Sequence, residues 1–161
     1  MHYRVATVND TRLYFDWAND PDTRRQSFNS APIGWEQHKV WFARKLTDPD
    51  ALLLVFETVD GVPVGQVRFE KQADSDVIIG VSVDTAFRGR GLAAELIREA
   101  CTVCRKKWNN PAPGHNRQNV LISAYIRPEN VASIRAFEKA GFANSHESRK
   151  FGVESVCLTL N

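Results

Sequence analysis

A glycine-rich turn in the middle of the chain has the composition of an anion-binding site. The turn reads Arg88-Gly89-Arg90-Gly91-Leu92-Ala93. It follows an apolar segment at 77–83 that is typical of a buried strand, and apolar residues at helical spacing begin at Leu92. Backbone N–H groups at such a helix start favour a phosphate, and glycines let it approach closely. We therefore predict a phosphate or pyrophosphate site; the alternative is a flexible turn with two solvated arginines.

The common nucleotide-binding loops do not fit this turn. The nucleoside-triphosphate loop ends in Gly-Lys-Ser/Thr, which is absent here. The dinucleotide pattern needs a third glycine where this chain has Ala94, and it follows the first strand of its unit. The anion predicted here is therefore held by a different kind of loop.

A second segment has the signals of a well-capped helix. A strand-like run at 120–126 is followed by Asn130, whose side chain can cap the first turn of a helix at 131–140. Gly141 can adopt the left-handed conformation that ends it. The segment reads Asn130-x-x-Ser133-x-x-x-Phe137-Glu138-Lys139-Ala140-Gly141-Phe142.

Together the two segments resemble the cofactor motifs of the GCN5-related N-acetyltransferases, the GNAT superfamily. Arg88-x-x-Gly91-x-Ala93 matches the family's Arg/Gln-x-x-Gly-x-Gly/Ala, and the second segment matches Asn-x-x-Ala/Ser-x-x-x-Tyr-x-x-x-Gly-Phe. The resemblance implies an α+β fold with a mixed, mostly antiparallel sheet and helices on both faces. In that fold the parallel strands 77–83 and 120–126 splay apart around acetyl-CoA, the co-substrate. No metal is implied.

The resemblance also assigns the cofactor contacts. Backbone groups of Val81 and Val83 would bind the pantetheine amides, and an N–H near Val81 would face the thioester oxygen. Asn130 would reach the pantetheine arm, unless it only caps the helix, and Ser133 the phosphate end, unless it only fills the first turn. The remaining implied cofactor residues are Arg88, Gly89, Arg90, Gly91, Leu92, Ala93 and Phe137.

Phe137 departs from the family pattern, because relatives often have a tyrosine there that protonates the departing sulfur. Tyr125 and Ser82 are therefore the catalytic candidates, with Asp76 as a further polar residue of Ser82's strand face. The alternatives are a half-buried strand tyrosine and an ordinary polar strand face. Without a strong base, the site suits amines of low pKa: deprotonating a lysine at pH 7 costs about 4.6 kcal/mol, an α-amine about 1.2 kcal/mol.

The N-terminal third points to an amino sugar as the acceptor. Its residues 17–42 resemble acetyltransferases that modify nucleotide-linked deoxyamino sugars, including those of the pseudaminic-acid route. Asn29, His38 and Arg68 would then bind hydroxyls or a diphosphate. The alternative for the aromatic residues around His38 is core packing. Two rival functions stay open: acetylation of protein N-termini, as in the ribosomal-protein acetyltransferases, and acyl-CoA sensing without efficient turnover.

Composition agrees with a small enzyme. The 161 residues suggest one domain, 1–161, and the net charge of +2 argues against nucleic acid as a partner. No apolar run suits a membrane span, and the N-terminus lacks the pattern of a secretion signal. Cys101 and Cys104 fall on the apolar stripe of a helix, so we expect core packing and a reducing, cytoplasmic location. The protein could form a homodimer.

The elements that position these residues can be placed from hydrophobic periodicity and turn residues. The hairpin signal Asp60-Gly61 joins two of the strands. A polar loop at 108–118 interrupts the second half of the chain. We predict strands at 3–7, 51–57, 62–70, 77–83, 120–126 and 153–160, helices at 9–17, 35–46, 131–140 and from 92 onward, and a helical turn from Asp20.

Overall fold

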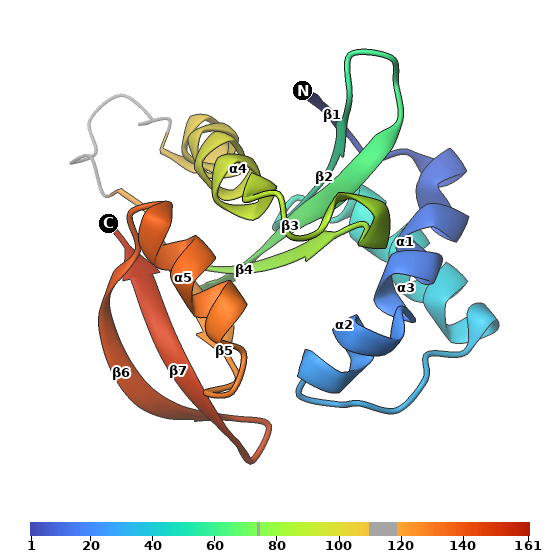
Figure 1. Ribbon diagram of the computed structural model, residues 1–161. Helices are drawn as coiled ribbons and strands as arrows, with labels where there is room; N and C mark the ends of the chain where they lie inside the picture. The colour runs from blue at the N-terminus through green and yellow to red at the C-terminus, as the bar shows by residue number, and fades with distance from the viewer. Residues whose placement is uncertain (74, 110–118) are drawn as a thin grey trace.

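A seven-stranded sheet divides the helices of this protein into two layers (Figure 1). The computed structural model describes residues 1–73, 75–109 and 119–161, so the predicted polar loop lies largely outside the described residues. The strand order is β1-β2-β3-β4-β5-β7-β6. The strands are β1 (His2–Val5), β2 (Ala51–Glu57), β3 (Pro63–Ala73), β4 (Asp76–Val83), β5 (Leu121–Ile126), β6 (Ala143–Lys150) and β7 (Val153–Leu160).

Strand β2 shows how the two layers arise, because its side chains are buried on both faces. Leu52, Leu54 and Phe56 pack in a core with α4 (Leu92–Trp108) and α5 (Val131–Lys139). Leu53 and Val55 point the other way, into a second core with α1 (Thr11–Ala18) and α3 (Trp35–Thr47). Successive strand residues face opposite sides, so an almost continuous apolar strand needs cover on both. The short α2 (Pro21–Gln26) follows α1 on the second side (Figure 1).

The two central strands diverge, as the family resemblance implied. β4 and β5 run parallel and pair at three positions, the last being Ile78 with Ser123. Beyond that point β4 stays paired with β3 as far as Val83, and β5 stays paired with β7 as far as Ile126. The predicted α+β fold with splayed parallel strands is confirmed, and the splay leaves an unpaired backbone edge on β4.

Four features differ from the sequence-based expectation. Strand β1 ends at Val5 rather than at residue 7. Strand β6 was not predicted, because its residues are polar and carry no alternating pattern. It lies at the edge of the sheet and pairs with β7 alone among the described strands. β3 continues to Ala73 rather than ending at residue 70. The helical turn expected at Asp20 is a complete helix, α2, with Asp20 as its cap and Pro21 at its first position.

Candidate functional site

The unpaired edge of β4 leads directly to the glycine-rich turn. Side chains of Val81 and Val83 pack against the α4–α5 core, so the backbone of this stretch runs along the splay while its valines anchor it. After β4 come a short 3-10 helix (Thr85–Phe87) and then the turn at Arg88. Strand edge and turn are therefore contiguous, which is the arrangement required for a long ligand with a phosphate end.

The turn presents the start of α4 without any side-chain cap. Gly91 is the N-cap residue and has φ +73°, in the left-handed region that glycine adopts without strain. Among the described residues, no side chain caps the first turn of α4, in contrast to α5, where Asn130 does so. The amides at Leu92 and Ala93 thus begin a 17-residue helix whose dipole favours an anion at this end. Gly89, at φ +74°, and the exposed Arg90 flank the same position.

The Arg88 side chain is already bound to carboxylates and a backbone carbonyl of this protein. Its Nη2 lies 2.7 Å from Asp20 Oδ2, its Nη1 lies 3.3 Å from Asp22 Oδ2, and its Nε donates to the Val83 carbonyl at 2.9 Å. Burial would raise the pKa of Asp20, but hydrogen bonds from Arg88 and the Thr23 amide bring it below its ordinary value. The Arg88 side chain therefore ties α2 to the turn, and its charge is already balanced by carboxylates.

The second motif is placed at the other strand of the splay. Asn130 Oδ1 accepts from the Ser133 amide at 3.2 Å, so this side chain caps α5. Phe137 is buried and meets Phe142 edge to face, with ring centroids 4.9 Å apart. The phenyl ring at the position of the family's tyrosine is thus part of the core, and it offers no proton.

Tyr125 lies on β5 opposite Cys157 of β7, on the face away from α4 and α5. Burial raises the pKa of Tyr125, and its interaction with the Cys157 thiol raises it further. Lys150 Nζ lies 4.7 Å from the centre of the Tyr125 ring. A raised pKa keeps the Tyr125 hydroxyl protonated near neutral pH, so this side chain has a proton to offer and is unsuited to act as a base.

Ser82 lies on the same side of the sheet, on the other strand of the splay. Gln66 Nε2 donates to Ser82 Oγ at 3.1 Å, which leaves the Ser82 hydroxyl hydrogen for another acceptor. Gln66 is only 5% exposed, and its Oε1 is buried without a hydrogen-bond partner among the described residues. Gln26 Oε1, at the end of α2, is likewise buried without a hydrogen-bond partner among the described residues. Sequence reasoning missed both glutamines, since nothing in their sequence context distinguishes them.

The three predicted acceptor residues fall in different environments. His38 is 2% exposed, stacks on Phe42, and its Nε2 donates to the Thr11 carbonyl at 2.8 Å. Burial lowers the pKa of His38, so the ring is neutral and joins α3 to α1. Asn29 is exposed and bonds locally to the Ala31 amide. Arg68 faces the splay over Gly80, and of the three it alone is placed with Ser82 and Gln66.

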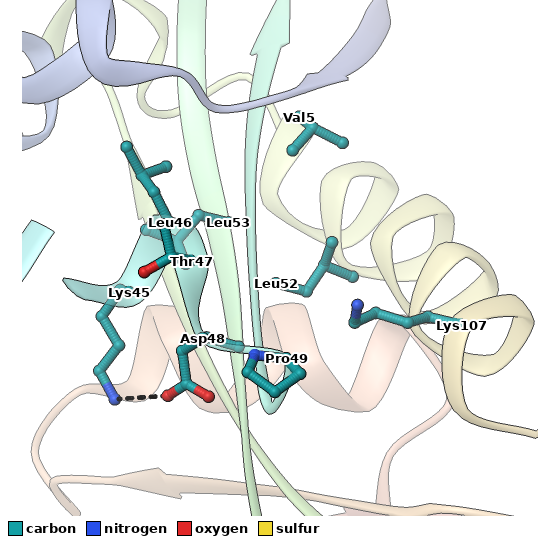
Figure 2. Close-up of a pocket in the computed structure, with 10 residues that line it drawn as sticks. Val5, Lys45, Leu46, Thr47, Asp48, Pro49, Leu52, Leu53 and Lys107 are labelled. Carbon is teal, nitrogen blue, oxygen red and sulfur yellow. Dashed lines mark ion pairs between the residues drawn. The ribbon is translucent and has the colours of Figure 1, made fainter. Parts of the chain in front are cut away.

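A hollow of about 340 Å³ lies elsewhere on the molecule. Figure 2 shows Lys45, Asp48 and Lys107 around it, where the end of α3 meets the start of β2. It shares no lining residue with the splay or the glycine turn, so we do not assign the reaction to it. Within the described part of the chain, no group of three or more His, Cys, Asp or Glu residues could hold a metal. None of the described helices has the length and apolar character to cross a membrane.

Comparisons with known proteins converge on one family. Residues 2–143 match the model of the acetyltransferase (GNAT) domain. A mycothiol acetyltransferase of Corynebacterium glutamicum is 30% identical over 120 residues, covering 70% of this chain and 36% of that protein. The chain spans about a third of the length of the curated relatives it matches.

Solved structures of related fold include a polyamine and an aminoglycoside acetyltransferase. The spermidine N-acetyltransferase of Vibrio cholerae, in complex with CoA and spermine, has a TM-score of 0.82 at 15% identity, covering 98% of this chain and 92% of that one. An aminoglycoside acetyltransferase in complex with coenzyme A has a TM-score of 0.77 at 17% identity, covering 99% and 93%. At these identities the likeness concerns the fold.

Proposed function

The chain belongs to the GNAT acetyltransferase family, and from that premise we propose that it is an acetyl-CoA-dependent N-acetyltransferase acting on a primary amine. The observation that carries the proposal is the unpaired edge of β4, which leads into an uncapped, glycine-started helix. Acetyl-CoA would supply the acetyl thioester, and transfer to an amine yields an amide and a free thiol. The residues present fit such a co-substrate, since extended backbone can bind pantetheine amides and the α4 start can bind phosphate.

The groups around the diverging strands would each have a separate role in the reaction. The backbone N–H groups of β4 near Val81 would stabilise negative charge on the thioester oxygen. Tyr125, which keeps its proton, would donate to the departing sulfur, directly or through water. Ser82, held by Gln66, would position the acceptor or a water molecule with its free hydroxyl hydrogen. No carboxylate base lies at these positions among the described residues, so the acceptor amine should reach the site already largely neutral.

That requirement favours an amine of lowered pKa, and we propose the amino group of a nucleotide-linked deoxyamino sugar. Ring oxygens withdraw electrons from such an amine and lower its pKa relative to lysine. A peptide N-terminus meets the same requirement on chemical grounds. The N-terminal third of the sequence, which resembles the sugar-modifying enzymes, is what favours the sugar.

A thiol-release assay with acetyl-CoA tests both the acetyltransferase activity and the identity of the acceptor. The panel would contain uridine-diphosphate amino sugars, free amino sugars, N-terminal peptides and spermidine, with a no-acceptor control. We expect release with the nucleotide-linked sugars. Release with peptides alone would overturn the sugar assignment. If calorimetry shows acetyl-CoA binding but no amine causes thiol release, the protein is an acyl-CoA sensor and not an enzyme.

A further inference from the structure

Two partly buried arginines, Arg68 on β3 and Arg24 on α2, lie on the acceptor side of the sheet. Burial lowers the pKa of Arg24, and the positive charge of Arg68 lowers it further. Arg24 donates to backbone carbonyls, among them that of Asn29 at 3.0 Å from Nη1. Arg68 packs over the ring of Trp41, with 5.6 Å from Cζ to the ring centre. Among the described residues, neither guanidinium has a carboxylate partner.

Four acidic residues near α1, α2 and the connection after β4 already have partners. Asp20 and Asp22 pair with Arg88, Asp10 pairs with Arg4, and Asp84 accepts from Trp17 Nε1 at 2.8 Å. These carboxylates are therefore not available to balance Arg68 and Arg24. Two partly buried like charges without a counterion are costly, and the cost falls when an anion binds between them.

The backbone makes room for Arg68 at the splay. Its side chain lies over Gly80, where a Cβ atom would approach Arg68 Nε to 3.2 Å. Gly80 is two residues beyond Ile78, the last β4 residue paired with β5. The guanidinium is thus held next to the diverging edge, on the face that carries Ser82 and the buried, unpartnered Gln66 Oε1. An acceptor that reaches the β4 edge from this side passes Arg68.

We propose that Arg68, supported by the charge of Arg24, binds an anionic group of the acceptor, and that the acceptor is therefore an amine carrying a phosphate. This inference rests on the proposed acetyltransferase function and adds that the acceptor is recognised by its negative charge. It predicts discrimination against polycationic acceptors such as polyamines and aminoglycosides. The paired arginines would repel such a cation.

The test compares acceptors that differ by one phosphate. An amino sugar and its 1-phosphate would be assayed with wild type, with Arg68→Gln and with a control, Arg12→Gln. Arg12 also lies over aromatic rings on this side of the sheet, but it is exposed and paired with Asp16. We expect Arg68→Gln to raise the KM for the phosphorylated acceptor about ten- to a hundredfold, with little change for the unphosphorylated one. Arg12→Gln should change neither.

A binding measurement separates failure of this inference from failure of the proposed function. Each variant would be titrated with the amino-sugar 1-phosphate in saturating CoA, so that the α4 start is already occupied. Loss of affinity in Arg68→Gln, with CoA affinity unchanged, supports the anion site. Equal loss for both acceptors would make Arg68 a packing residue and overturn the inference, leaving the acetyltransferase proposal intact. Absence of CoA binding by wild type would instead overturn the proposed function.

Discussion

The immediate neighbours of Tyr125, the proton donor that we propose, keep its hydroxyl protonated. Burial and the Cys157 thiol both favour its neutral form. Lys150 Nζ lies over the ring, 4.7 Å from its centre, in a cation–π contact. The family's usual donor position is occupied by Phe137, which is buried against Phe142. At the residue scale, we therefore propose that the proton donor lies on β5 rather than on α5.

Replacing Tyr125 with phenylalanine tests this assignment, since it removes the hydroxyl and keeps the ring. We expect turnover to fall about 10²-fold or more, in line with general acid contributions, while the KM for acetyl-CoA changes little. Because the pKa of Tyr125 is raised, wild-type activity should not decline from tyrosine ionisation between pH 7 and 9. Steady-state kinetics over this range give both readouts, with Tyr3→Phe as a control at the sheet edge. Near wild-type turnover would leave bound water as the donor.

The role of Gly91 in phosphate binding can be tested with Gly61 as a control, because both glycines have a similar positive φ. Gly91 and Gly61 have φ of +73° and +80°, and a Cβ atom at either would contact nothing within 4 Å. Alanine should therefore destabilise both variants similarly, by about 1–2 kcal/mol from backbone strain. We expect Gly91→Ala alone to weaken acetyl-CoA binding, about tenfold or more, because its methyl group would stand where the phosphate approaches the amides. Calorimetric titration and thermal unfolding measure the two effects, and equal acetyl-CoA affinity in both variants would contradict the phosphate-loop assignment.

The sequence predicted the residues whose role depends on the local backbone better than those whose role depends on tertiary contacts. The glycine turn and the Asn130 cap were both visible as local patterns. His38 was a candidate for the acceptor site, but its ring lies among Phe15, Trp35 and Phe42, where burial lowers its pKa. Whether a histidine is buried depends on how α1 and α3 pack, and local sequence does not encode that.

At the scale of elements, α2 links the two strands of the splay. Its N-terminal end is bound to the connection after β4 through Asp20 and Arg88. Its C-terminal end is bound to the connection after β5, because Arg127 donates from Nε and Nη2 to the Ser27 carbonyl at 3.0 and 2.9 Å. A six-residue helix thus spans the open end of the diverging strands. Only the start of α2 was visible in the sequence, since its two partners are 68 and 100 residues away.

Removing the Arg127 contact should loosen α2 without disturbing the cofactor turn. We expect Arg127→Ala to raise the KM for the acceptor severalfold, while acetyl-CoA affinity stays close to wild type. Amide hydrogen exchange should quicken at residues 21–28, which report on α2 directly. Arg135→Ala, an exposed arginine on α5, is the control. Unchanged exchange at 21–28 would mean that packing, and not Arg127, holds α2.

At the scale of the whole molecule, the sheet separates the larger apolar core from the side that carries the smaller core and the polar groups of the proposed site. Cys101 and Cys104 of α4 lie in the apolar layer, at 2% and 0% exposure, as the sequence predicted. The thiols pack with β-strand side chains of the larger core and are not paired as a disulfide. Burial raises the pKa of each to about 12, from an ordinary value of 9.0.

These buried thiols make stability depend on pH in a definite direction. Below pH 9 both thiols are protonated in the folded and unfolded states, so their contribution is fully present. As pH rises from 9 towards 12, the unfolded chain releases these protons while the folded protein retains them, and the free energy of unfolding falls. The limiting slope is about 1.4 kcal/mol per pH unit for each thiol.

Urea unfolding between pH 8 and 11, under reducing conditions, measures this dependence. The matched variant carries Cys101→Ala and Cys104→Ala, which remove the titrating groups and leave the other ionisable residues in place. The variant should be less stable at pH 8, because each alanine leaves a small void in the core. Its free energy of unfolding should nevertheless decline less steeply than that of wild type above pH 9. Parallel declines for the two proteins would mean that other groups, such as the buried Tyr14, whose pKa burial also raises, account for the alkaline loss of stability.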